Sequence, residues 1–73
     1  MHPLKIFRTA RSLSQKNLAG MLGVTRETVS RWEIGARKVD DELLPRVSEV
    51  TGISRTELRP DLAKLLESAE ARA

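Results

Sequence analysis

One pattern of apolar and polar positions occurs three times along the chain: an apolar residue, then Ser or Thr, then three polar residues, then an apolar residue. The copies are LSQKNL at residues 13–18, VTRETV at residues 24–29 and ISRTEL at residues 53–58. In each copy the hydroxyl residue suits a helix N-cap, because its oxygen can accept a hydrogen bond from a free N–H group of the first turn. The two apolar residues then occupy the positions of a hydrophobic staple. The pattern therefore predicts three helix starts.

Apolar residues at helical spacing extend this pattern into five helices. We expect them at residues 3–12, 15–22, 26–34, 41–51 and 55–59. Asp40 is the expected cap of the fourth helix, and Pro45 is tolerable there if it lies in about the first turn. Three helices are expected to end at Gly23, Gly35 and Gly52, because glycine enters the left-handed conformation cheaply. No strand-like alternation competes, so the predicted fold class is all-α.

The same spacing predicts which side chains face inward. They are Leu4, Phe7 and Ala10, with Ile6 widening the stripe, then Leu18, Ala19, Met21 and Leu22, and then Leu43, Leu44, Val47 and Val50. After Pro60 a last segment carries apolar residues at helical spacing, at Leu62, Leu65, Leu66 and Ala69. We expect one compact domain over residues 1–60 and a helical extension over residues 61–73, frayed at its end.

The composition is that of a small soluble domain: 73 residues, 40% apolar and 32% charged, without cysteine. No apolar run approaches the ~18 residues of a membrane span, so we expect a cytoplasmic protein. Residues 1–38 hold eight basic and two acidic residues, a net charge of +6, whereas residues 39–73 hold five basic and eight acidic residues, a net charge of −3. The basic half indicates a polyanionic partner, although a basic solvated surface fits the charge alone about as well.

Nothing in the sequence favours an enzyme or a metal site. The single histidine, His2, lies at the terminus, where disorder is the default. The acidic run from Asp40 to Glu42 suits the cap and first turn of a helix. Neither a phosphate-binding loop nor a nucleophile with a base is present, so we expect no catalysis, no cofactor and no metal.

Two short helices joined by a turn form the most informative arrangement. Residues 15–22 and 26–34 are connected through Leu22-Gly23-Val24-Thr25, which is the layout of a helix-turn-helix. The second helix would direct its free N–H groups and the positive end of its dipole at phosphates. Its first exposed side chains would then reach base edges in the major groove.

These residues carry a resemblance to a known family. The stretch SLSQKNLAGMLGVTRETVSRWEIGARK, residues 12–38, resembles the Cro/C-repressor class (XRE-type) of phage and bacterial helix-turn-helix regulators. The resemblance spans roughly residues 5–58 and implies a five-helix, lambda-repressor-like DNA-binding domain. More weakly, GISRTELRPD at residues 52–61 is similar to the end of the YdaS-like branch, small prophage regulators sometimes described as antitoxins.

The resemblance also implies which residues contact DNA. The positions that read bases in the family are matched here by Arg26, Glu27, Thr28 and Arg31. Arginine can bond guanine O6 and N7 together, glutamate can accept from cytosine N4, and threonine can bond a base edge or touch a thymine methyl. Alternatively, Arg26 and Glu27 are ordinary polar residues in the first turn of a helix and do not read bases.

A second group is expected at the DNA backbone, where contacts position the protein without reading sequence. Gln15 matches the family residue that clamps a phosphate. The full set of candidates is Arg8, Ser14, Gln15, Lys16, Asn17, Arg37 and Lys38. Two positions depart from the family: Ile34 is apolar where a backbone-contacting polar residue is frequent, and Ala36 replaces a frequently basic residue, for which Arg37 and Lys38 can compensate.

Three residues have a structural interpretation. Arg8 and Glu33 match a salt bridge that ties the first helix of the family to the third, and Arg8 could face a phosphate as well. Trp32 could stack on a base, but it shares a helix face with Val29, which the staple places in the core. We therefore expect Trp32 at the edge of the core.

The predicted function is that of a sequence-specific, double-stranded DNA-binding transcriptional regulator, a repressor that inserts its third helix into the major groove. One helix covers few base pairs, so a homodimer on a two-fold symmetric operator is expected. The interface candidates are Leu58, Leu62, Leu65 and Leu66, unless that stripe folds back on its own domain. The alternative functions are an antitoxin that neutralises a protein toxin and regulates its own operon, and a helical interaction module that has lost DNA binding.

Overall fold

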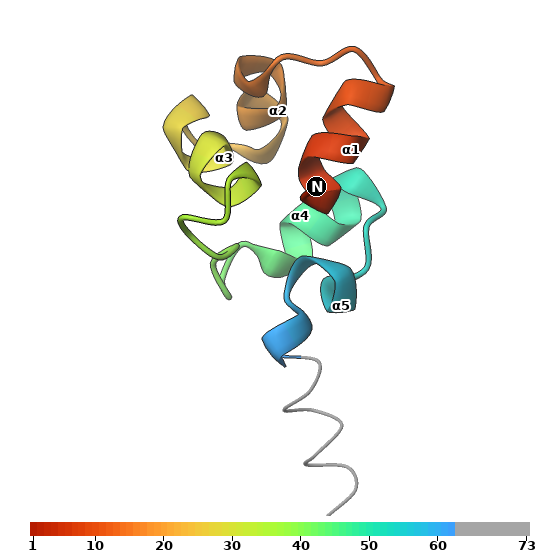
Figure 1. The fold of residues 1–73 in the computed structure, drawn as a ribbon, viewed down its shortest axis with the longest axis vertical. Coiled ribbons are helices and arrows are strands. Elements are labelled where there is room, and N and C mark those ends of the chain that lie inside the picture. The colour runs from red at the N-terminus through yellow and green to blue at the C-terminus, as the bar shows by residue number, and fades with distance from the viewer. Residues whose placement is uncertain (63–73) are drawn as a thin grey trace, which may run out of the picture.

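The computed structural model describes residues 1–62, and every element of regular secondary structure within them is a helix. Five helices lie between residues 3 and 58 (Figure 1): α1 Pro3–Ala10, α2 Gln15–Leu22, α3 Arg26–Glu33, α4 Leu44–Thr51 and α5 Arg55–Leu58. Residues 60–62 are helical as well. α2 packs most extensively on α3, α1 contacts α3 and α5, and α4 lies against α2 and α5. The all-α fold class with a helix-turn-helix is confirmed.

The repeated sequence pattern begins three of these helices as predicted. Ser14, Thr25 and Ser54 have extended backbones, and their hydroxyl oxygens accept from the N–H group three residues on, at 3.0, 3.2 and 3.2 Å. α2 ends at Gly23, whose φ of 72° is left-handed and whose N–H donates to the Ala19 carbonyl. The cap at Thr25 follows two residues later, which keeps the turn between α2 and α3 short.

One hydrophobic core joins the five helices. Its side chains come from every helix and from Val39 in the loop after α3. The flanking residues of the pattern, Leu13, Val24 and Ile53, pack against this core partly buried. Trp32 is fully buried at 0% exposure, deeper than the edge position predicted, and its Nε1 has no hydrogen-bond partner among the described residues. Trp32 is therefore a core residue and not a stacking platform for bases.

The fourth helix begins later than the sequence predicted. α4 starts at Leu44 and not at Asp41, and no side chain caps it. The reason is Pro45, which lacks an N–H group and fits only the first turn of a helix. Asp40 is consequently not the helix cap; its carboxylate bonds to Arg37 instead.

The first helix ends two residues early, at Ala10. The cause is Ser12, whose φ of 54° lies in the left-handed region and turns the chain out of the helix. The Leu13 N–H then donates to the Arg8 carbonyl, which closes this end of α1.

Several expected core positions lie at the surface. Ile6, Met21 and Val50 are 53%, 42% and 37% exposed, and Ala10 is exposed as well, because the buried stripe of each helix is narrower than the apolar pattern. By contrast Leu58, expected as an interface candidate, is buried in the core of its own domain.

Most of the predicted C-terminal extension, residues 63–73, lies outside the described part of the chain. Leu62 is partly buried and packs against the core. Leu65 and Leu66, with the rest of the predicted extension, lie outside the described residues.

Candidate nucleic-acid interface

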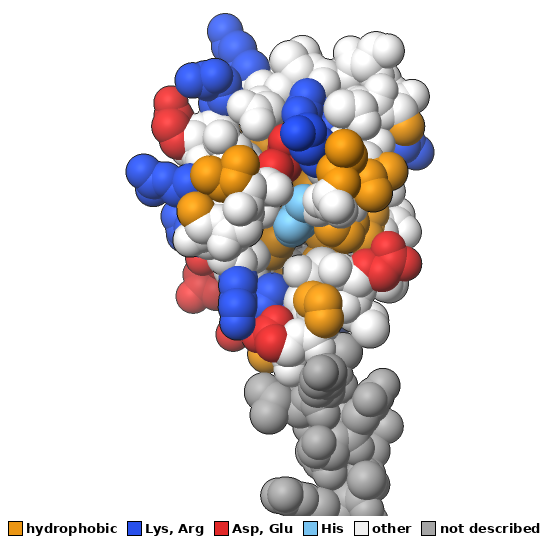
Figure 2. Space-filling view, viewed as in Figure 1, with side chains coloured by type: hydrophobic (Ala, Val, Ile, Leu, Met, Phe, Trp, Pro, Cys, Tyr) orange, Lys and Arg blue, Asp and Glu red, His pale blue; other side chains and the backbone are white. Residues whose placement is uncertain are grey.

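α3 presents one buried and one exposed face. Val29 and Trp32 are in the core, whereas Arg26, Glu27 and Arg31 are exposed. With 3.6 residues per turn, Glu27 and Arg31 lie one turn apart, opposite the buried face. α3 lies at one edge of the molecule (Figure 1), and Lys and Arg side chains project along that edge in Figure 2. The structure therefore leaves three of the four candidate base-reading residues accessible.

The fourth candidate, Thr28, is less accessible. It is half-buried, and its hydroxyl oxygen lies 2.9 Å from that of Thr25, the cap of α3. Its N–H also donates to the Thr25 hydroxyl. Since the helix cap engages this hydroxyl, Thr28 has less hydrogen-bonding capacity left for a base edge than the arginines have.

On the buried side of α3, Glu33 connects this helix to α1 and α2. Arg8 of α1 donates from Nε and Nη2 to the two Glu33 carboxylate oxygens, both at 2.9 Å, and from Nη1 to the Leu13 carbonyl at 3.1 Å. Gln15 of α2 donates from Nε2 to the same carboxylate at 3.2 Å. The Glu33 side chain is 2% exposed and that of Arg8 15%. One carboxylate of α3 thus fixes the orientation of α1 and α2 beside it.

These bonds determine the ionisation of the pair. Burial raises the pKa of Glu33, but the hydrogen bonds from Arg8 and Gln15 and the charge of Arg8 outweigh it, so the pKa lies below its ordinary value of 4.5. The hydrogen bond to Glu33 raises the pKa of Arg8. Three of the five Arg8 N–H groups are used inside the domain, so two remain for its expected phosphate contact.

Acid should weaken the fold through this carboxylate. Because the pKa of Glu33 is lower in the folded than in the unfolded chain, its contribution is complete above pH 4.5 and is lost as the pH falls through the folded value. Denaturant midpoints measured from neutral pH down to about pH 3 should therefore decrease. Glu33→Gln should flatten this decrease below pH 4.5; an equal decrease in both proteins would assign the acid sensitivity to other carboxylates.

His2 was expected to be disordered but caps α1. Its Nδ1 accepts from the Leu4 N–H at 3.1 Å, and its side chain is half-buried. Burial lowers its pKa below 6.5 against the opposing effect of Glu33, and the N-terminal charge lowers it further. The cap requires this neutral form, because a protonated Nδ1 cannot accept. The predicted helix start at Pro3 already implies this cap, because the residue before the first helical residue occupies the cap position.

The remaining phosphate candidates on α2 form its first turn. The Ser14 hydroxyl bonds to the Asn17 side chain while it caps α2, so both residues also serve the start of the helix. Lys16 is exposed on the same turn. Lys16 and the N–H groups that the cap leaves unused therefore offer donors at the same end of α2 as Gln15.

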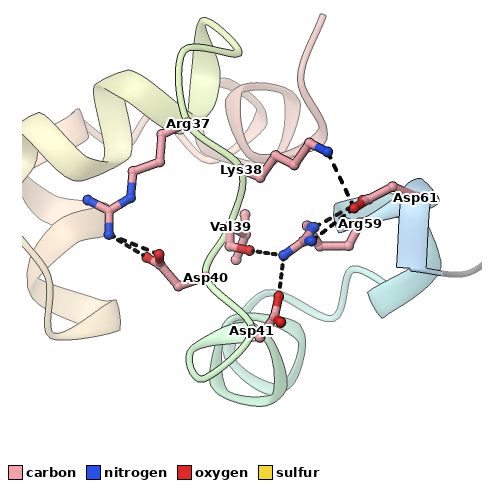
Figure 3. Close-up of polar contacts among 7 residues, drawn as sticks. All are labelled: Arg37, Lys38, Val39, Asp40, Asp41, Arg59 and Asp61. Carbon is pink, nitrogen blue, oxygen red and sulfur yellow. Dashed lines mark hydrogen bonds and ion pairs between the residues drawn. The ribbon is translucent and has the colours of Figure 1, made fainter.

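Arg37 and Lys38, in the loop after α3, both have acidic partners (Figure 3). Arg37 donates from Nη2 to the two Asp40 oxygens at 2.9 and 3.0 Å, and the Lys38 ammonium lies 3.4 Å from an oxygen of Asp61. Their side chains stay 45% and 70% exposed. Both cations keep N–H groups that can reach a phosphate, but the neighbouring carboxylate offsets part of their positive charge.

Sequence reasoning missed the residue that organises this loop, Arg59. It donates from Nη1 to the Val39 carbonyl at 2.7 Å and to Asp41 at 2.5 Å, and from Nε and Nη2 to the two Asp61 oxygens at 3.0 and 2.9 Å (Figure 3). Its side chain is 11% exposed. No local pattern links residues 39, 41 and 59, since only the fold brings them together.

Ile34 is the apolar exception on this surface. It caps the end of α3 in a helical conformation and is 74% exposed. Three residues after Arg31 and seven after Glu27, it continues their exposed stripe. Its side chain offers no hydrogen bond to the DNA backbone.

Residues 1–62 contain no helix that is long and apolar enough to cross a bilayer. In the same part of the chain, no three histidine, cysteine or acidic side chains gather so as to hold a metal ion.

Comparison with known proteins gives a consistent result. The chain matches the helix-turn-helix family HTH_3 over residues 4–58, from α1 to α5. It is 33% identical over 73 residues (92% of this chain, 68% of the relative) to the SPbeta prophage-derived uncharacterized HTH-type transcriptional regulator YonR of Bacillus subtilis strain 168. It is 35% identical over 51 residues (70% of this chain, 44% of the relative) to the uncharacterized HTH-type transcriptional regulator YqaE of the same organism. No solved structure matches the chain significantly.

Proposed function

We propose that this chain, which belongs to the helix-turn-helix family HTH_3 of the Cro/C-repressor class, is a repressor that inserts α3 into the major groove of a two-fold symmetric operator. The family and its relatives make the chain a DNA-binding regulator of transcription and not an enzyme. Repression, the operator symmetry and the contacting residues are the parts that we propose.

One observation carries the proposal: the exposed face of α3 is polar, and its buried face is locked to α1 and α2. Arg26 and Arg31 are exposed, and the same helix is fixed from behind by Glu33. A rigid helix with free donors on its leading face is what direct readout in the major groove requires. We assign base contacts to Arg26, Glu27 and Arg31, with a smaller contribution from Thr28.

Gln15 and Lys16 are the proposed phosphate contacts on the α2 side. Gln15 uses one amide hydrogen for Glu33 and keeps a second for a phosphate, because its amide carries two. The base-reading helix and the phosphate clamp are thereby joined through one carboxylate.

Selection of binding sites from a random pool of double-stranded DNA tests the proposal. We expect a two-fold symmetric consensus with half-sites about one helical turn, ~34 Å, apart. An unenriched pool would contradict sequence-specific binding, and a single unrepeated site would contradict the dimer while leaving the reading helix in place.

Lys16→Ala should weaken binding to every DNA sequence to a similar extent. Lys16 is exposed at the start of α2, where a lysine neutralises a phosphate without reading a base. The slope of log K against log salt should become shallower by about 0.9 for the lost contact. Fluorescence anisotropy on the selected operator and on a random duplex checks this; a loss confined to the operator would instead make Lys16 a specificity residue.

We further propose that residues 1–60 form the DNA-binding domain and that residues beyond them join two copies. Leu65 and Leu66 are the interface residues in this proposal, since Leu58 lies in the core and Leu62 packs against it. Sedimentation of a chain that ends at Leu62 tests it. The shortened chain should be monomeric and bind its operator more weakly, and an unchanged dimer would place the interface elsewhere.

A further inference from the structure

In the loop after α3, Arg37 and Lys38 each lie close to a carboxylate, and the fold holds one of these carboxylates more firmly than the other. Arg37 is paired with Asp40, a neighbour three residues on in the same loop. Lys38 is paired across the fold with Asp61, 23 residues further along the chain. Both pairs are solvent-exposed, so each can open without breaking the core.

Asp61 does not move freely, because Arg59 holds it. Two N–H groups of the Arg59 guanidinium bond to its two oxygens at 3.0 and 2.9 Å (Figure 3). Arg59 is itself fixed by the Val39 carbonyl at 2.7 Å, and Val39 is 1% exposed in the core. The guanidinium keeps the pKa of Asp61 well below its usual range, so the group remains a carboxylate. Lys38 therefore faces an anion held in place by the fold.

On binding, DNA would offer Arg37 and Lys38 a different anion, a phosphate group. A phosphate oxygen accepts the same N–H donors as a carboxylate oxygen, so one cation cannot give its full charge to both. Arg37 and Lys38 lie four and five residues after the end of α3. A helix seated in the major groove carries the loop behind it toward the sugar-phosphate backbone.

We propose that Asp40 and Asp61 are positioning residues for DNA binding, which hold Arg37 and Lys38 and compete with DNA phosphates for them. The inference rests on the proposed function. While the carboxylates hold these cations, fewer DNA counterions are released on binding, which lowers the affinity and the steepness of its salt dependence. Added salt weakens the internal pairs as well, which makes the slope shallower still.

Neutralising either carboxylate should therefore strengthen DNA binding. Asp61→Asn and Asp40→Asn should each raise the affinity for a random duplex about two- to five-fold at low salt, the range typical of exposed ion pairs. The slope of log K against log salt should steepen by up to about 0.9 for each released cation. A purely structural role for these acids would leave that slope unchanged.

Asp41→Asn is the matched control, because it removes the same charge from the same loop but touches Arg59 and not Arg37 or Lys38. Its effect measures the change in net charge together with the loss of the Asp41 bond to Arg59, and it leaves the carboxylate partners of Arg37 and Lys38 in place. The effect of Asp61→Asn should vanish in a Lys38→Ala background, and that of Asp40→Asn in an Arg37→Ala background. If Asp61→Asn disturbs folding, the Asp40 and Arg37 pair tests the competition independently.

Two results would overturn the inference: slopes of the Asp40 and Asp61 variants equal to that of Asp41→Asn, or effects that persist without the cations. Failure of the proposed function would give a different result from failure of this inference. In that case the wild-type chain itself would show no salt-dependent binding to a duplex, and no variant comparison would be needed.

Discussion

Glu33→Ala is expected to cost about 3 kcal/mol of unfolding free energy, because breaking one side of a buried ion pair leaves the other charge without a partner. The substitution removes the acceptor of three hydrogen bonds, two from Arg8 and one from Gln15. A domain of this size has a stability of only about 4–11 kcal/mol, so the loss is a large part of the total. Urea denaturation followed by circular dichroism measures it.

Glu27→Ala is the matched control for this prediction. Glu27 lies on the same helix but is exposed, and substitutions of that kind usually change stability by less than about 0.5 kcal/mol. Glu33→Gln should fall between the two, because the amide retains acceptor capacity but lacks the charge. Equal stabilities of the two alanine variants would show that the bridge between α1, α2 and α3 does not hold the domain together.

Arg31→Ala is expected to cost about 1–3 kcal/mol in operator binding and to relax the preference at one base position of each half-site. Arg31 is exposed one turn after Glu27, whereas the residue after it, Trp32, is fully buried. The substitution therefore removes a candidate base contact without opening the core, and its thermal stability should stay near that of the wild type. Affinities for the selected operator and for single-base variants of it measure both effects.

The discriminating comparison for Arg31 is with a random duplex. Direct readout predicts that the variant loses much more affinity for the operator than for random DNA, which reduces the ratio between them. Losses of the same size on both would make Arg31 a phosphate contact and would move sequence reading to Arg26 and Glu27.

The helix starts were predictable because their causes are local. Ser14, Thr25 and Ser54 each have the acceptor that a first turn lacks, and their neighbours supply the apolar pair that packs beneath it. Gly23 is equally local, since few residues other than glycine adopt its φ readily. These short-range rules set α2, the turn and α3, and with them the accessible face of the candidate site.

The parts that could not be predicted depend on contacts between distant residues or on competing local rules. Asp40 looks like a cap, but Pro45 delays the helix, and the carboxylate pairs with Arg37. Arg59 carries no local signal, because its partners, such as Val39, approach it only through the fold. The depth of Trp32 follows from packing by all the helices around it, which helical spacing alone does not give.

The central claim is that Arg31 of α3 reads a guanine in the major groove, and replacing single guanines of the selected operator with 7-deazaguanine tests it most directly. The replacement removes the N7 acceptor that a bidentate arginine uses and leaves base pairing intact. Replacing one such guanine in each half-site should weaken binding of the wild-type chain but cause no further loss in Arg31→Ala. The claim is contradicted if no replacement weakens binding of the wild type. It is also contradicted if each replacement that weakens binding of the wild type weakens binding of Arg31→Ala to the same extent.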